Sequence, residues 1–260
     1  MVSFVTDMQV AIDPDSSSQS CSRLDAYFGD REGRALLEPL ITRVFPGRIA
    51  LVSSFGAESA VLLHMVASID RATPVIFLNT GKLFGETLAY RETIVERLGL
   101  TDVRDIRPDP VDAARADPAG DLWNRDVSAC CWFRKVLPLQ RALSGFSAWI
   151  TGRKRFQSSG RASLGTFETE FERIKVNPLT RWSPERIAAY IAEHDLPAHP
   201  LVAQGYASIG CAPCTSPVTG REDSRDGRWR GQDKTECGIH FVQERVIRSS
   251  DRHGEGGDTA

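Results

Sequence analysis

The fold class follows from two stretches of the chain, RIALVSSF at residues 48–55 and PVIFLNT at residues 74–80. Both are short, rich in β-branched residues and almost continuously apolar, as strands buried on both faces of a parallel sheet are. Residues 57–69 and 86–98, which follow these two stretches, carry apolar side chains at helical spacing. The alternation predicts an α/β protein with a mainly parallel sheet flanked by helices.

Later segments continue this alternation. Residues 147–151 (SAWIT) predict a further strand, and Ser183 predicts the start of a helix because Pro184 and Glu185 follow it. In parallel α/β sheets, ligands bind beyond the carboxyl ends of the strands. The segments expected to bind a ligand are therefore residues 53–59 and 79–85.

The composition of the 260-residue chain fits one large core, because 41% of the residues are apolar and no repeat or linker interrupts them. The first residues are rich in Ser, Asp and Gln, and the last are mostly Gly and charged residues. We predict a disordered tail at residues 1–20, one catalytic domain at residues 21–245, and a flexible tail at residues 246–260.

The charge balance argues against nucleic-acid and membrane partners. The chain carries 32 Lys and Arg against 34 Asp and Glu, a net charge of −2, which creates no basic field. The apolar runs fall far short of the ~20 residues that a membrane-spanning helix needs. No Lys or Arg precedes Arg23, unlike in a secretion signal, so we expect a cytoplasmic protein whose six cysteines are thiols or ligands.

Small residues fill the predicted strand-to-helix turn at residues 53–59 (SSFGAES). Such a turn can present backbone N–H groups to an anion at the helix N-terminus. It does not match the common ATP loop, since Gly81-Lys82 is followed by Leu83 rather than by Ser or Thr. A purely architectural turn is the alternative interpretation.

Four of the six cysteines are spaced like metal ligands. Cys130 adjoins Cys131, and Cys211 and Cys214 form a Cys-x-x-Cys turn. A disulfide between adjacent cysteines is disfavoured, because their Cα atoms lie ~3.8 Å apart and ordinary bridges need roughly 4.4 to 6.8 Å. The pattern favours a four-thiolate site, for zinc or for an iron–sulfur cluster, over thiols buried only for packing.

The remaining candidate is Cys237, which lies among the cations of residues 225–230 and 234–240. Nearby cations favour the thiolate, which is the nucleophilic form of cysteine. Glu236 opposes that effect. A solvated charged segment with an incidental cysteine is the alternative.

Taken in order, these motifs resemble those of the assimilatory adenylyl-sulfate reductases, within the family that acts on adenylyl and phosphoadenylyl sulfates. The resemblance covers residues 48–240 and rests on SSFGAES, FLNTG at residues 77–81, CCxxRK at 130–135, IGCAPC at 209–214 and ECGIH at 236–240. It implies an adenine nucleotide alpha hydrolase-like fold of the PP-loop type. It also implies reduction of adenosine 5'-phosphosulfate to sulfite and AMP with electrons from thioredoxin or a glutaredoxin-like dithiol donor, in sulfate assimilation and cysteine biosynthesis.

The same resemblance assigns roles to individual residues. Cys237 would be the nucleophile that forms an S-sulfocysteine, and Cys130, Cys131, Cys211 and Cys214 would ligate one [4Fe-4S] cluster. The residues expected to bind the phosphosulfate are Lys135, Arg225, Arg228 and His240. Those expected to bind the adenosine and phosphate are Ser53, Ser54, Phe55, Gly56, Leu78, Thr80 and Gly81.

Three alternatives stay open at this point. Related enzymes that act on the 3'-phosphorylated substrate usually lack the four ligand cysteines, which favours the unphosphorylated substrate, but a phosphoadenylyl-sulfate or dual-specificity reductase remains an alternative. A PP-loop ATP-dependent tRNA-thiolating enzyme would need the S-G-G-x-D-S form, which is absent here. A zinc-stabilised nucleotide sensor is the third. Asn79 and Ile239 depart from the family's usual Asp and Leu, and a homo-oligomeric state is left open.

Overall fold

The strands form one layer with a single antiparallel member at its edge. This computed structural model describes residues 17–220, 222–232 and 234–240, which contain β1 (Ile49–Ser53), β2 (Val75–Leu78), β3 (Val103–Ile106), β4 (Ala148–Ile150), β5 (Phe167–Glu170) and β6 (Arg173–Val176). In this part of the chain they pair in the order β3-β2-β1-β4-β6-β5. All neighbours are parallel except β5 and β6. The predicted α/β class with a mainly parallel sheet is confirmed.

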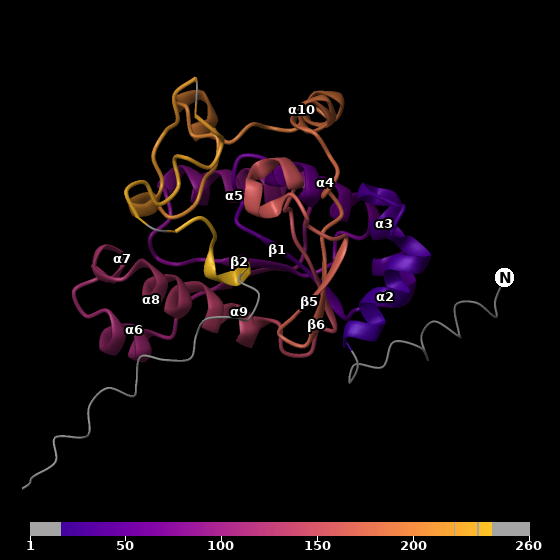
Figure 1. Cartoon of the computed structure of the whole chain (residues 1–260), viewed down its shortest axis with the longest axis horizontal. Helices are drawn as coiled ribbons and strands as arrows, with labels where there is room; N and C mark the ends of the chain where they lie inside the picture. Colours follow the sequence, from indigo (N-terminus) through magenta and orange to yellow (C-terminus); the bar gives the residue numbers. More distant parts are fainter. Residues whose placement is uncertain (1–16, 221, 233, 241–260) are drawn as a thin grey trace, which may run out of the picture.

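Helices cover both faces of the sheet (Figure 1). They are α2 (Ser17–Phe28), α3 (Gly33–Pro39), α4 (Ser59–Ile69), α5 (Gly85–Leu98), α6 (Pro110–Ala116), α7 (Leu122–Arg125), α8 (Val127–Cys131), α9 (Leu137–Ala142) and α10 (Pro184–Glu193). Short 3₁₀ and π turns are η1 (Leu40–Val44), η2 (Trp132–Val136), η3 (Arg155–Gln157), η4 (Ser159–Arg161), η5 (Pro200–Gln204), η6 (Ala212–Cys214) and η7 (Gly238–His240). None of the helices in the described ranges is long and apolar enough to cross a membrane.

Successive side chains of β1, β2 and β4 enter different cores, because they alternate between the two faces of the sheet. Ile49 and Leu51 of β1 pack into the larger core with α3, α4, α5 and α10. Ala50 joins the smaller core, in which Trp149 of β4 packs with Leu139 of α9. The central strands β1, β2 and β4 are almost entirely apolar because both of their faces are covered.

The predicted elements agree with the observed ones to within a few residues. The stretch at residues 48–55 contains β1, the stretch at 74–80 contains β2, and the stretch at 147–151 contains β4. The Ser183 hydroxyl caps α10 by accepting a hydrogen bond from the backbone N–H of Arg186 at 3.3 Å, as its sequence context predicts. Of the tails predicted at residues 1–20 and 246–260, residues 1–16 and 246–260 lie outside the described residues. Residues 17–20 are described and form the first turn of α2, so the predicted N-terminal tail extends too far into the chain. The single domain at residues 21–245 stays a prediction.

The strand order fixes where a ligand can bind. From β1 the chain moves to β2 and β3 on one side, and then returns to place β4 on the other side of β1. Where the connections that follow two neighbouring strands run to opposite sides, a crevice forms at the carboxyl ends of those strands. In this sheet that crevice lies beyond Ser53 of β1 and Ile150 of β4.

Candidate active site

A cavity of about 230 Å³ lies at this crevice, lined by residues that follow β1 and β4. Of the residues singled out in the sequence, those that line it are Ser53, Ser54, Gly56, Leu78, Lys135, Arg225, Arg228 and Cys237. Residues separated by more than 180 positions in the chain therefore share one cavity. The side chain of His240, predicted to contact the substrate, lies outside the described part of the structure.

The turn between β1 and α4 supplies the floor of the cavity. The backbone N–H of Phe55 donates to Ser53 Oγ at 3.2 Å, and Phe55 adopts a positive φ of 48°. Its ring is buried against Phe77 at 5.3 Å between centroids, so Phe55 supports the turn from behind and is not one of the cavity-lining residues. A Cβ on Gly56 would lie 3.3 Å from the carbonyl oxygen of Ile209, which explains why a residue without a side chain fits there.

The segment after β2 divides between the cavity and the cysteines. Leu78 lines the cavity, but Thr80 faces the cysteine side, where its hydroxyl lies 3.2 Å from Cys211 Sγ. Gly81 has a φ of 70°, a conformation that favours glycine. The carbonyl oxygen of Thr80 accepts a hydrogen bond from Arg134 at 2.9 Å. Thr80 and Gly81 thus connect the end of β2 to the cysteines.

The four predicted ligand cysteines gather around one small space. Cys130 and Cys131 end α8, whose first turn is capped by Asp126; Cys211 precedes η6, and Cys214 is its last residue. All four are buried, and they line a space of about 10 Å³ together with Lys82, Trp123, Arg134, Lys135, Pro213 and Trp229. No carboxylate or imidazole lines that space. Within the described ranges, no group of three or more His, Cys, Asp or Glu side chains is arranged to hold a metal ion.

The thiol of Cys237 lies at the junction of this space and the larger cavity. A hydrogen bond from Cys131 lowers the pKa of Cys237 and enclosure in the protein raises it, while Lys135 and Arg228 lower it further, so that the pKa falls well below the ordinary thiol value. Burial instead raises the pKa of Cys130 to about 11. Lys135 and Arg228 are thus two cations that favour the thiolate of Cys237.

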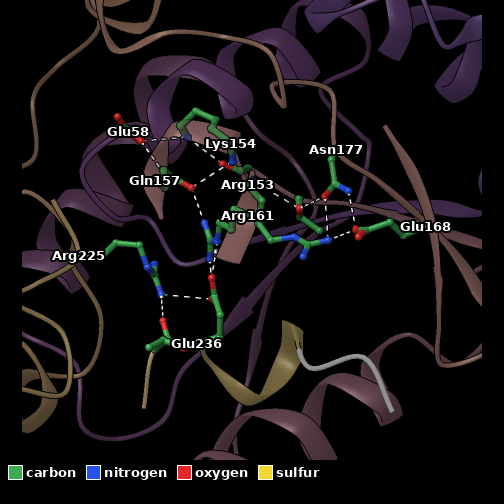
Figure 2. A network of polar contacts seen from close by, with 12 residues as sticks. Glu58, Arg153, Lys154, Gln157, Arg161, Glu168, Asn177, Arg225 and Glu236 are labelled. Atoms are coloured by element: carbon green, nitrogen blue, oxygen red, sulfur yellow. Dashed lines mark hydrogen bonds and ion pairs between the residues drawn. The ribbon is translucent and has the colours of Figure 1, made fainter. Parts of the chain in front are cut away.

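The cations around the cavity fall into two groups. Three have carboxylate partners that hold them in place: Arg153 pairs with Glu168, Lys154 with Glu58 and Arg161 with Glu236. Figure 2 shows Gln157 joining the Lys154–Glu58 pair to the Arg161–Glu236 pair, while Arg153 and Glu168 both contact Asn177. Arg225 also reaches Glu236.

The second group consists of Lys135 and Arg228, which form no ion pair with any carboxylate in the described part of the chain. The Arg228 guanidinium lies over the Trp229 ring at 4.4 Å, and its buried Nε has no hydrogen-bond partner among the described residues. Gly210 gives it room, because a Cβ there would lie 2.2 Å from an Arg228 nitrogen. An unpaired guanidinium beside a cavity is suited to an anionic ligand.

Residues 48–217 match the model of the phosphoadenosine phosphosulfate reductase domain. A protein of Mesorhizobium japonicum named adenosine 5'-phosphosulfate reductase is 51% identical over 87% of this chain and 89% of its own length. The chain belongs to the phosphoadenosine phosphosulfate reductase family. A member from Gloeobacter violaceus, named phosphoadenosine 5'-phosphosulfate reductase, is 41% identical over 76% of this chain and 84% of its own length.

A solved structure of the family has the same fold. The phosphoadenylyl-sulfate reductase of Candida auris, in complex with phosphate, superposes with a TM-score of 0.66 at 27% identity, covering 78% of this chain and 98% of that one. In this member of the phosphoadenosine phosphosulfate reductase family, the sequence motifs indicated the strand-end turns, the cysteines, Lys135 and Arg228. They gave no such role to Arg153, Lys154 or Arg161, although the run GRKRFQSSGR at residues 152–161 is visibly basic.

Proposed function

We propose that this protein reduces adenosine 5'-phosphosulfate to sulfite and AMP with electrons from a dithiol protein such as thioredoxin. The observation that carries the proposal is the meeting of Cys237 with Lys135 and Arg228 at the cavity beyond β1 and β4. A nucleophile, cations without carboxylate partners and a strand-end turn suited to a phosphate are what such a reaction needs. The naming of the Mesorhizobium japonicum relative supports the same substrate.

The first step is attack of the Cys237 thiolate on the sulfur of the substrate's sulfate group. A bond forms between Sγ and that sulfur, and the bond from sulfur to the bridging phosphate oxygen breaks, so AMP leaves with the electron pair. Cys237 then carries an SO3 group as S-sulfocysteine. Lys135 and Arg228 offset the negative charge of the phosphosulfate and of the departing phosphate.

The second step returns the enzyme to its starting state. A thiolate of the dithiol protein attacks Cys237 Sγ, sulfite leaves with the electrons of the S–S bond, and a mixed disulfide forms. The second thiol of the partner resolves this disulfide, which releases Cys237 as thiolate and oxidises the partner. This attack requires that Cys237 be reachable from outside, and its side chain is not fully buried.

The floor of the cavity, formed by the turn between β1 and α4, is suited to the nucleotide. Ser53, Ser54 and Gly56 present the turn at the N-terminus of α4, where partial positive charge favours a phosphate. Leu78 adds an apolar contact for the adenosine. Phe55, Thr80 and Gly81, also expected at the substrate, support these contacts from positions outside the cavity lining.

We further propose that Cys130, Cys131, Cys211 and Cys214 hold one [4Fe-4S] cluster. The donor set fits, since four buried thiols enclose one space without carboxylate or imidazole, and thiolates are the ligands such clusters take. Lys135 beside that space, which has no carboxylate partner in the described part of the chain, would offset part of the charge of four thiolates, whereas Arg134 is paired with Asp117. When bound, the cluster would tie α8 to η6 and add negative charge near Lys135. The attack on sulfur is carried out by Cys237.

The test uses protein purified without oxygen, with iron and sulfide measured per chain. Adenosine 5'-phosphosulfate and its 3'-phosphorylated form are supplied separately with reduced thioredoxin, and sulfite is measured. We expect sulfite from the unphosphorylated substrate and, without thioredoxin, one SO3 adduct on Cys237 by peptide mass spectrometry. Cys237→Ser should lower sulfite formation at least about 1,000-fold and abolish the adduct. Sulfite formation at the wild-type rate by Cys237→Ser would disprove the mechanism, and a preference for the 3'-phosphorylated substrate would reassign the substrate.

A further inference from the structure

The carboxylate of Glu236 is held by arginines from two separate segments. Arg161, at the end of η4, contacts both carboxylate oxygens, with a distance of 2.7 Å from Nη2 to Oε2. Arg225, which precedes the Trp229 turn, donates to the same Oε2 at 3.2 Å. In Figure 2 the two guanidinium groups reach Glu236 from different sides.

Further contacts fix the two arginines themselves. Arg225 also donates to the carbonyl oxygen of Thr235 at 3.0 Å, so it holds the backbone before the nucleophile as well as the side chain. Arg161 donates to Gln157, whose amide in turn donates to Glu58 at 3.0 Å. A continuous polar path therefore joins the start of α4 to the residue beside Cys237.

The environment of Glu236 makes these contacts strong. The side chains of Arg161, Arg225 and Glu236 are 7%, 13% and 17% exposed, so water competes weakly for them. Burial alone would raise the pKa of Glu236, but the Arg161 hydrogen bonds and the positive charges lower it, so the carboxylate stays ionised. Charge-assisted, two-pronged contacts of this kind also restrict geometry.

A carboxylate one residue before a nucleophile would by its charge repel both the thiolate and an anionic substrate. The two guanidinium groups neutralise that charge, which leaves the reach and direction of the side chain as its contribution. We propose that Glu236 is a positioning residue, whose clamp by Arg161 and Arg225 holds Cys237 at the cavity. This inference rests on the proposed function for its kinetic consequences only, because the clamp itself is present without substrate.

The kinetic arm compares Glu236→Gln and Glu236→Asp with the wild-type holoenzyme. A displacement of about 1 Å at a reacting group can cost roughly 100-fold in rate. We expect Glu236→Gln to lower kcat by about 10- to 100-fold with KM changed less than about threefold. Glu236→Asp keeps the charge but is one methylene shorter, so it should lose about tenfold in kcat. If charge alone mattered, Glu236→Asp would behave as wild type, and the proposal would be overturned.

The second arm needs no substrate. Cys237 is alkylated with iodoacetamide at a pH above the ordinary thiol pKa, so that the rate reports access, and peptide mass spectrometry follows that one residue. In Glu236→Gln the clamp is released, so the alkylation rate of Cys237 should rise at least about fivefold. The matched control is Glu222→Gln, which also loses an Arg partner, Arg230 at 2.6 Å, but lies outside the cavity lining and should match wild type.

Each result decides the matter. Unchanged alkylation together with kcat within twofold of wild type in Glu236→Gln would overturn the clamp. If Glu236→Gln lowered both kcat and thermal stability while the alkylation rate of Cys237 did not change, the variant would be generally destabilised, and the proposal would be overturned too. Should wild-type protein make no sulfite from either nucleotide, the proposed function would fail, and the alkylation comparison would still test the clamp.

Discussion

Two walls of the cavity carry similar numbers of cations but differ in how those cations are held. On one wall, Arg153, Lys154 and Arg161 each pair with a carboxylate, although Arg161 shares Glu236 with Arg225, and much of their positive charge is cancelled. On the other, Lys135 and Arg228 have no such partner in the described part of the chain. A count of basic residues therefore overstates the field that a ligand experiences. The paired wall maintains shape, and the unpaired wall is suited to bind an anion.

In this comparison of the two walls, the largest expected effect comes from removing an unpaired cation. Arg228→Gln should lower kcat/KM for adenosine 5'-phosphosulfate by about 100- to 1,000-fold, because the charge that faces the anionic group is lost. Lys135→Ala should act in the same direction while iron content stays at the wild-type level. The free energy of unfolding measured in urea should change by less than about 1 kcal/mol in either variant, because neither side chain neutralises a buried carboxylate. A large stability loss with kcat/KM unchanged would erase the distinction between the walls.

On the paired wall, a smaller effect is expected, and it should appear as a loss of stability. Lys154 is 3% exposed and lies 2.9 Å from Glu58, which is 28% exposed. Lys154→Met should destabilise the fold by about 2 kcal/mol, less than the ~3–5 of a fully buried pair, because water still reaches Glu58. Adding Glu58→Gln should recover most of that loss. Equilibrium urea denaturation of the single and double variants measures both, and a double variant no more stable than the single would contradict the pairing.

The smallest effect is expected at a neutral group away from the cavity. His199 is buried, its Nδ1 accepts from the backbone N–H of Leu201 at 3.2 Å, and its Nε2 lies 3.0 Å from Thr87 Oγ1. Burial lowers its pKa below 6.5, so the unfolded chain takes up a proton at a higher pH than the folded one. Stability should then fall as the pH drops through 6.5 toward the lowered value.

His199→Gln, whose amide can replace the Nε2 contact with Thr87, should reduce that pH dependence by at most about 1.4 kcal/mol per pH unit. Thermal unfolding from pH 7.5 to 5.5 compares the slopes in wild type and variant. His64, whose pKa is also lowered by burial, is common to both proteins and cancels in the comparison. Identical slopes would mean that His199 takes up its proton without cost in the folded state.

The sequence was most informative where function depends on local chain geometry. Buried parallel strands are continuous apolar runs, so β1 and β2 were predictable, and the turns after them follow from the rule that ligands bind at carboxyl ends. The strand β5 was missed because its pattern, Phe-Glu-Thr-Glu, alternates at an antiparallel edge. Edge strands of this kind are short and polar, and they differ little from a loop in sequence.

Ion pairs between residues far apart in the sequence could not be predicted in the same way. Arg161 and Glu236 are 75 positions apart in the sequence, and a separation of the same order divides Lys154 from Glu58. No local sequence pattern can therefore pair them. Glu236 was expected to oppose thiolate formation, and that expectation considered only its neighbours in sequence. The structure brings two arginines to it, which changes its contribution from charge to position.

Because the crevice opens between the first and fourth strands, its lining is spread along nearly the whole polypeptide, from Leu51 to Ile239. During synthesis on the ribosome, the strand layer can assemble well before the nucleophile is translated. A product terminated ahead of residue 225 would thus retain the framework yet lack Arg225, Arg228 and Cys237. The growing polypeptide therefore becomes reactive only at the end of its synthesis, and no early fragment is partly active.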